Sequence, residues 1–298
     1  MSETPFMALA AAFLWASSAP VVNLGLHRLP DTHKATHILL GLMLSLIAGS
    51  LALLLVFGPA SVGDLSLEPS VIGAGLFTFA IGTGLYYLCG HAYGVRTELA
   101  AQFANVKPLI TVVFGLLVFS EPFGTGTAIA LLLVGAGLTI LLVGTAKGRM
   151  SWLPITLGGL LAISWSLGEV FVKLSVVHAD SDIITVNALI SATVIYTLCA
   201  VPFFILRRGD LQVSLNWMWP FAVHGVISFG AAYTLFFGSI AQLGLAKTVL
   251  ITVFWPGIAI LLSFAVNRLR GVPNNVPAFS LYAMVLLLFG SFVQVVFA

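Results

Sequence analysis

Three charged side chains stand inside apolar stretches that are long enough to cross a bilayer. Lys107 precedes Pro108 within the stretch from residue 99 to 122, and Glu169 and Lys173 lie in a second stretch. A charge at the bilayer centre costs roughly 3 kcal/mol on insertion scales. Proline removes a helical hydrogen bond, which frees backbone polar groups where lipid cannot satisfy them. We therefore expect Lys107 and Pro108 to face a wet cavity. The alternative is an ordinary kink with Lys107 snorkelling to the interface.

The second charged stretch has a helical spacing. Trp165, Glu169 and Lys173 recur every four residues, so they share one face of a helix. That face is poorly suited to lipid, and it predicts a polar track into a central cavity in which Glu169 could change its protonation state. The alternative is a self-neutralised pair of Glu169 with Lys173 that stabilises helix packing.

Aromatic residues with polar tips occur in the same stretches as these charges. Tyr86 and Tyr87 lie in the glycine-rich segment that contains His91, and such side chains can line a polar cavity. Alternatives are simple packing for Trp15 and a place in the interfacial belt for His91. The candidate substrate-binding residues are Trp15, Tyr86, Tyr87, His91, Lys107, Trp165, Glu169, Lys173 and Trp255.

The chain reads as a duplicated unit. Pro256 lies 148 positions after Pro108, and the same separation relates Gly82 to Gly230. We expect two repeats, residues 1–147 and 148–298, with Pro108 and Pro256 as matching hinges. An odd number of crossings per repeat inverts the second copy, and such repeats enclose a binding site near the bilayer midplane.

Composition excludes a soluble domain. The 298 residues are 60% hydrophobic and 7% charged, with a mean hydropathy of +1.11, which indicates an all-α membrane protein. At about 20 residues per crossing, the sequence predicts ten transmembrane helices around a central cavity. Their expected ranges are 5–27, 34–57, 70–93, 98–119, 124–145, 154–176, 183–206, 217–241, 246–267 and 276–297.

The positions of the basic residues predict the orientation. Most lysines and arginines lie in the odd-numbered connections between the predicted helices, and positive residues favour the cytoplasmic side. We therefore expect a multi-pass protein of the bacterial inner membrane with both termini outside. The residues that carry this bias are Arg28, Lys34, Arg96, Lys147, Arg149, Arg207, Arg208, Arg268 and Arg270.

Several classes of function lack their sequence signals. Cys89 and Cys199 lie in apolar segments and form no CxxC pair, and the six histidines are scattered without an HExxH motif. No nucleotide-binding loop and no dense basic cluster occurs, so we expect no metal, no cofactor and no nucleic-acid partner. We do not expect an enzyme or a channel. A non-transport structural protein is the alternative of another class, but it leaves the intramembrane charges unexplained.

These motifs give the chain a resemblance to the drug/metabolite transporter superfamily, specifically its ten-helix EamA-type members. The resemblance covers essentially the whole length. It implies two inverted five-helix repeats and transport of small organic metabolites by alternating access, with export the commoner direction. In the second half "NRLRG" replaces the acidic joint of the first. The motifs are Trp15 with Ser17 and Ser18, Trp165 with Ser166 and Gly168, the run around Pro108, Glu121 in "SEPFGTG", and Gly135 with Gly137.

The charges and aromatic residues together suggest a substrate class. Lys107 and Lys173 could bind an acidic group and Glu169 an amine, which suits an amino acid or a related zwitterion. The alternative is an organic or phosphorylated anion, if Lys173 fully occupies Glu169. Protons are a candidate coupling ion. The sequence does not determine the oligomeric state, for which a monomer is one option.

Overall fold

The computed structural model describes residues 4–63, 67–92, 106–146, 152–269 and 278–297, and these contain helices and no strand. The first half contains α1 (Thr4–His27), α2 (Lys34–Phe57), the short turn η1 (Pro59–Ser61), α3 (Pro69–Gly75), the π-helical η3 (Leu76–Gly82), α4 (Thr83–Ala92), α6 (Lys107–Leu117) and α7 (Thr125–Ala146). The second half contains α8 (Trp152–Ser175), α9 (Ser181–Leu206), the turn η4 (Arg208–Asp210), α10 (Leu215–His224), the π-helical η5 (Gly225–Ala232), α11 (Tyr233–Leu243), α12 (Leu245–Thr252), α13 (Trp255–Leu269) and α14 (Ala278–Val296).

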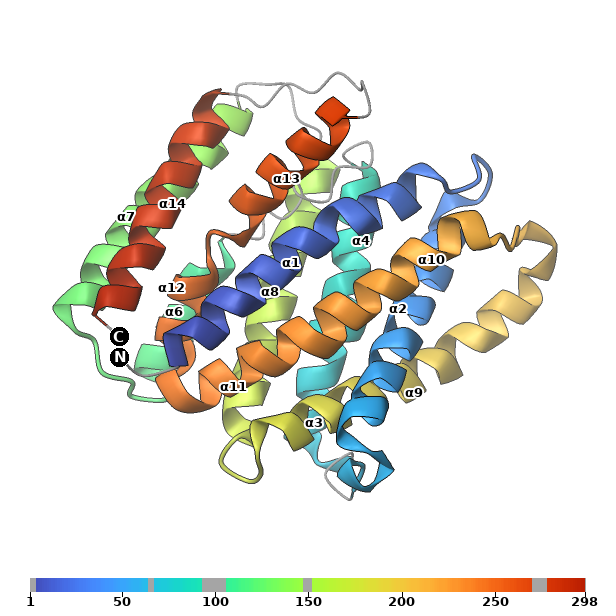
Figure 1. The fold of residues 1–298 in the computed structure, drawn as a ribbon, viewed down its shortest axis with the longest axis horizontal. Helices are drawn as coiled ribbons and strands as arrows, with labels where there is room; N and C mark the ends of the chain where they lie inside the picture. Colours follow the sequence, from blue (N-terminus) through green and yellow to red (C-terminus); the bar gives the residue numbers. More distant parts are fainter. Residues whose placement is uncertain (1–3, 64–66, 93–105, 147–151, 270–277, 298) are drawn as a thin grey trace.

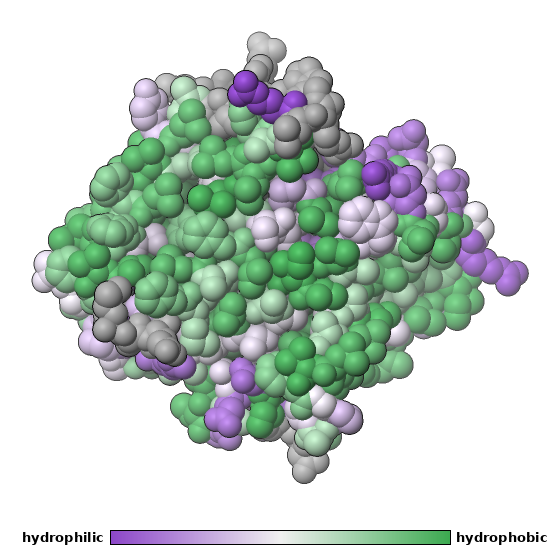
Figure 2. All heavy atoms as spheres, viewed as in Figure 1, coloured by the Kyte–Doolittle hydropathy of each residue, from purple (hydrophilic) through white to green (hydrophobic). Residues whose placement is uncertain are grey.

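The helices have the length and composition of membrane crossings. Within the described ranges, eight continuous helical segments are long and apolar enough to span a bilayer. Two shorter apolar helices, Lys107–Leu117 and Thr125–Leu141, fall on the fourth and fifth predicted crossings. Apolar side chains cover most of the face seen in Figure 2. The prediction of an all-α membrane protein is confirmed, although residues 98–105 of the predicted fourth crossing lie outside the described residues.

The two halves pack through reciprocal contacts. Helix α1 packs on α10, α11, α12 and α13 of the second half, and α8 packs on α3, η3, α4 and α6 of the first. The pairs α2 with α9 and α7 with α14 likewise join equivalent crossings (Figure 1). Each half therefore packs mainly on helices of the other, and the division into two repeats stays a prediction.

Both halves also contain a π-helical segment in their third crossing. The segments η3 and η5 begin at Leu76 and Gly225, close to the separation that relates the two prolines. Just before η3, a Cβ on Gly75 would lie 2.1 Å from the carbonyl oxygen of Ala188 in α9. At the start of η5, a Cβ on Gly225 would lie 2.1 Å from the carbonyl oxygen of Ser45 in α2. Glycine therefore allows backbone contact at both crossings.

The two prolines stand at helix starts. Pro108 is the second residue of α6, and Pro256 is the second residue of α13, which follows a break after Thr252. In the first turn of a helix proline costs little, because its missing N–H would have no intrahelical partner. At Pro256 the expected kink is therefore a break between two helices, α12 and α13. A hinge role for either proline stays a prediction.

The glycine contacts generate a stability prediction. Gly75→Ala and Gly225→Ala should each lower the thermal unfolding temperature of the purified protein, because the new methyl group meets a backbone carbonyl. Overpacking of this kind typically costs about 1–3 kcal/mol. The matched control is Gly159→Ala in α8, where a Cβ meets no atom within 4 Å. Equal unfolding temperatures for all three variants would contradict the proposed close packing.

Candidate functional site

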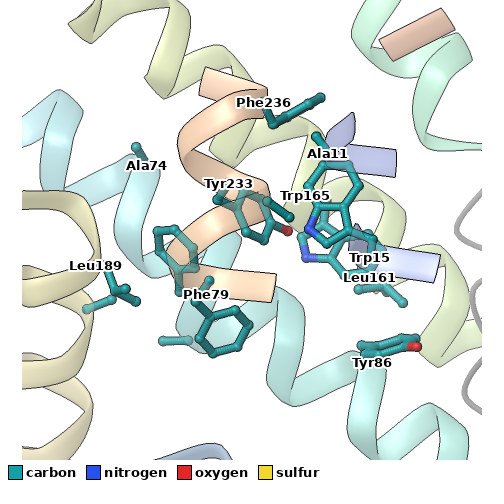
Figure 3. Packing of buried hydrophobic residues seen from close by; sticks show 14 of the residues in the cluster. Ala11, Trp15, Ala74, Phe79, Tyr86, Leu161, Trp165, Leu189, Tyr233 and Phe236 are labelled. Carbon is teal, nitrogen blue, oxygen red and sulfur yellow. The ribbon is translucent and has the colours of Figure 1, made fainter. Parts of the chain in front are cut away.

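A cavity lies between the two halves of the protein. It has a volume of about 400 Å³ including its mouth. Figure 3 shows how Trp15, Trp165 and Tyr233 converge in this region, with Tyr86 beside them. The wall is mainly aromatic, and it carries one cation together with hydroxyl and imidazole groups. The lining residues are Trp15, Ser18, Thr83, Tyr86, Lys107, Trp165, His224, Ser228, Phe229, Tyr233 and Trp255.

Lys107 enters the cavity wall from the first residue of α6. Its Nζ lies 5.8 Å from the ring centroid of Trp165 and 5.5 Å from that of Phe236. Aromatic faces attract a cation at such distances. The N-terminus of a helix, however, is itself electropositive and disfavours a lysine. This position therefore requires a nearby anion.

Glu169 of α8 supplies that anion. Its Oε1 accepts a hydrogen bond from Lys107 Nζ at 2.5 Å, and its Oε2 accepts one from Thr111 Oγ1 at 2.9 Å. The Lys107 side chain is 12% exposed and that of Glu169 only 3%. Thr111 follows Lys107 by one turn of α6, so a single face of this helix holds both carboxylate oxygens. The carboxylate that compensates the Lys107 charge thus comes from the other half of the chain.

Lys173, one turn after Glu169 on α8, also pairs with the first half. Its Nζ lies 3.3 Å from Glu121 Oε1. The Glu121 carboxylate in addition accepts hydrogen bonds from the backbone N–H groups of Leu245 at 2.7 Å and Ala246 at 2.8 Å. These residues begin α12, so Glu121 satisfies two N–H groups that have no partner within the helix. The acidic joint of the first half therefore stabilises a helix of the second.

The alternative pairing of Glu169 with Lys173 along α8 is accordingly wrong. Each residue reaches a different partner, Lys107 for Glu169 and Glu121 for Lys173. A partner on a neighbouring helix can add hydrogen bonds from its own surroundings, as Thr111 does for Glu169. Buried ion pairs repay their desolvation only with such additional bonds.

The structure brings five of the nine candidate residues into the cavity wall. These are Trp15, Tyr86, Lys107, Trp165 and Trp255.

The other four candidates do not line the cavity. Glu169 lies behind Lys107, and Lys173 is held by Glu121. Tyr87 is fully buried with its hydroxyl 2.9 Å from Ser45 Oγ. His91 lies near the end of α4. Tyr87 thus faces Ser45 of α2, and a role of Tyr87 or His91 in substrate binding stays a prediction.

Six lining residues were absent from the candidate set. His224 and Ser228 are four residues apart, as are Phe229 and Tyr233. The same four-residue spacing singled out Trp165, Glu169 and Lys173, and a search for it in the eighth crossing would have found these four residues. The remaining two, Ser18 and Thr83, are small hydroxyl residues that carry no comparable signal. The missed residues are Ser18, Thr83, His224, Ser228, Phe229 and Tyr233.

Metal ligation finds no support in the described part of the chain. No group of three or more histidine, cysteine, aspartate or glutamate side chains there could hold an ion. Cys89 is buried and Cys199 is exposed. The arrangement is thus suited to noncovalent binding of an organic molecule, since aromatic walls with a few convergent polar groups are typical of such sites.

Comparisons with known proteins agree with this architecture. A solved crystal structure, titled only as that of a protein, superposes with a TM-score of 0.71 at 17% identity, covering 100% of this chain and 99% of that chain. At this identity the likeness shows the fold alone. No curated protein matches the sequence.

A helical membrane fold with a mainly aromatic cavity between its halves is typical of multi-pass membrane transport proteins. Residues 4–143 match the EamA-like transporter family. The resemblance predicted from the sequence is confirmed. The match implies a membrane transporter of small molecules, and the long apolar helices indicate a protein embedded in a lipid bilayer.

The ion pair at Glu121 generates a second stability prediction. Glu121→Gln removes the charge that neutralises Lys173 and replaces one acceptor oxygen at the start of α12 by a donor. We expect a loss of about 2 kcal/mol in the free energy of unfolding, measured as a lower unfolding temperature in detergent. Asp31→Asn is the control, because Asp31 pairs with Lys34 while its side chain is 99% exposed. If both variants unfold alike, Glu121 does not hold the two halves together.

Proposed function

We propose that this protein is a secondary transporter that carries a small zwitterionic metabolite, such as an amino acid, by alternating access. The observation that carries the proposal is the Lys107–Glu169 ion pair at the cavity. A zwitterion can replace both partners at once, its carboxylate on Lys107 and its ammonium on Glu169. The site then keeps a net charge of zero. The Lys107–Glu169 pair is replaced by two pairs with the substrate, so no buried charge is left unpaired. By analogy with the family, export is the favoured direction.

An organic anion is the second candidate. Lys107 lines the cavity, whereas Glu169 stands behind it and already accepts two hydrogen bonds. If Glu169 keeps these bonds during transport, only the cation is available to the substrate. Protonation of Glu169 would then release Lys107 for the anion. This reading makes protons the coupling ion, while the zwitterion reading does not require them.

Substitution of Lys107 tests the site. Lys107→Ala should abolish transport into proteoliposomes, and Lys107→Arg should rescue it only in part, since a guanidinium has a different shape and donor geometry. Lys107→Ala should also destabilise the fold by about 3–5 kcal/mol, because Glu169 is left buried without its cation. The double variant Lys107→Gln with Glu169→Gln removes both charges and should regain stability without regaining transport. Lys34→Ala, in an exposed pair with Asp31, is the control. Normal transport by the double variant would reject the central site.

Glu169→Gln separates the two candidate substrates in the same assay. The probes are L-norleucine and hexanoate, which differ only in the ammonium group. A zwitterion site predicts that the wild type prefers norleucine and that Glu169→Gln loses this preference. An anion site coupled to protons predicts that both proteins bind hexanoate and that Glu169→Gln loses the pH dependence of transport. Binding to either protein is measured as an increase in its unfolding temperature. A ligand concentration of 100 times the dissociation constant stabilises the folded state by about 2.7 kcal/mol.

The orientation of the protein in a bacterial inner membrane is a further part of the proposal. Arg28 donates to the carbonyl oxygen of Asn216, so the first and seventh connections lie together at one end of the molecule. Arg207 and Arg208 stand at the same connection. This clustering supports a cytoplasmic position for that end and an external position for both termini. Four residues of the bias, Arg96, Lys147, Arg149 and Arg270, lie outside the described residues.

Cysteine labelling tests the orientation. Gly209→Cys and Gly63→Cys place single thiols in exposed connections at opposite ends, and a Cβ at either position meets no atom within 4 Å. In a background with both native cysteines replaced, an impermeant reagent applied to intact cells should label the cysteine at 63 and not the one at 209. Permeabilised cells, in which both should react, are the control. The reverse pattern would place the termini in the cytoplasm.

A further inference from the structure

We propose that Trp15 and His224 form a polar subsite of the cavity that binds a neutral group able to accept and donate hydrogen bonds at once. The chemistry that fits is a carboxamide, which offers an acceptor oxygen and a donor nitrogen. The substrate class is then a zwitterion whose side chain ends in a carboxamide. This inference rests on the proposed function and narrows it.

The observation behind the subsite is a pair of buried polar atoms without partners. Trp15 Nε1 and His224 Nδ1 have no hydrogen-bond partner among the residues that the structure describes. Trp15 is 7% exposed and His224 4%, and both residues line the cavity. Nearly all buried polar side-chain atoms in proteins are hydrogen-bonded to protein or to ordered water. Two such atoms at one cavity therefore indicate groups that are kept for a ligand.

The duplicated scaffold supplies an internal comparison. Trp165 lies 150 positions after Trp15, at the start of the equivalent motif of the second half. Its Nε1 donates to the carbonyl oxygen of Thr78, at 3.2 Å, within the π-helical segment η3. Trp165 thus uses its N–H for the fold. At the equivalent position Trp15 leaves its N–H unused by the described residues, although both rings line the same cavity.

The ring nitrogens of His224 define what the subsite can bind. Nδ1 has no hydrogen-bond partner among the described residues. In neutral histidine one ring nitrogen donates and the other accepts, and a proton on Nε2 makes Nδ1 the acceptor. Trp15 of α1 and His224 of α10 line the same cavity, so the indole donor and the imidazole can contact one ligand.

This donor and acceptor discriminate between side chains of similar shape. A carboxamide satisfies both, its oxygen on Trp15 and its NH₂ group on His224. A carboxylate cannot donate to His224, and an apolar group leaves both protein atoms buried and unpaired. Sites built to hydrogen-bond a ligand reject the analogue that lacks the group for this reason.

The test compares three α-amino acids of similar size in purified protein. L-Glutamine carries the carboxamide, L-homoleucine is its apolar counterpart, and L-glutamate carries a carboxylate. Dissociation constants are measured by calorimetry in detergent. We expect glutamine to bind about tenfold or more tightly than either analogue, since each hydrogen bond contributes roughly three- to tenfold.

Variants then assign the preference to the two residues. Trp15→Phe removes the indole N–H, and His224→Gln keeps a polar group only near the position of Nε2. Each should reduce the preference for glutamine to about threefold or less. His224→Asn places its amide near the position of Nδ1 and should retain more of this preference. Trp217→Phe, outside the cavity wall, loses a comparable ring and a structural hydrogen bond to the carbonyl oxygen of Gln212. This control should lower the unfolding temperature while the ratio of glutamine to homoleucine stays as in the wild type.

Each remaining outcome has a defined meaning. Equal binding of glutamine and homoleucine, or a preference for glutamate, overturns the subsite and leaves the zwitterion proposal standing. A glutamine preference that persists in both Trp15→Phe and His224→Gln also overturns it, provided that both variants unfold cooperatively. If none of the three amino acids binds to the wild type, while hexanoate does, the proposed zwitterion transport fails and the subsite for a zwitterion fails with it.

Discussion

The cost of a charge inside a bilayer is the constraint on which this architecture depends. Helix α8 carries Glu169 and Lys173 on one face, and each is paired with a residue of the first half. Separation of either pair would leave a buried charge without its partner, so the two pairs stabilise the packing of the two halves. The same pairs place Lys107 at the cavity and Glu121 at the first turn of α12. Burial of charge thereby connects the stability of the fold with the position of the site.

Interrupted helices are the second contribution to the site. The π-helical segment η3 exposes carbonyl oxygens, which Trp165 and Ser164 of α8 satisfy by hydrogen bonds to Thr78 and Phe77. The start of α6 and the break before α13 likewise bring backbone ends to the level of the cavity. Irregular backbone is tolerated at membrane depth only where protein or water can satisfy it. In this protein such backbone surrounds the cavity, where neighbouring side chains supply the bonds.

Positions that the predicted repeat would match carry different residues in the two halves, and the cavity is therefore asymmetric. Lys107 and Trp255 are separated by 148 residues and both begin a helix immediately before a proline, yet one is a cation and the other an indole. Trp15 and Trp165 match in position but differ in the use of their N–H groups. An asymmetric small molecule requires such differences, because two identical walls would present the same group to both of its ends. The proposed substrate recognition rests on these departures from symmetry.

The sequence by itself determined the helical type of the elements, the membrane setting and the residues that bear charge. Hydrophobic length and the cost of intramembrane charge are local properties, so Lys107, Glu169 and the tryptophans could be singled out. Only the tertiary structure decided their partners. It paired Glu169 with Lys107 rather than with Lys173, and it turned Tyr87 toward Ser45. The rotation and depth of each helix arise from packing against helices far away in the sequence, and periodicity along one helix does not specify them.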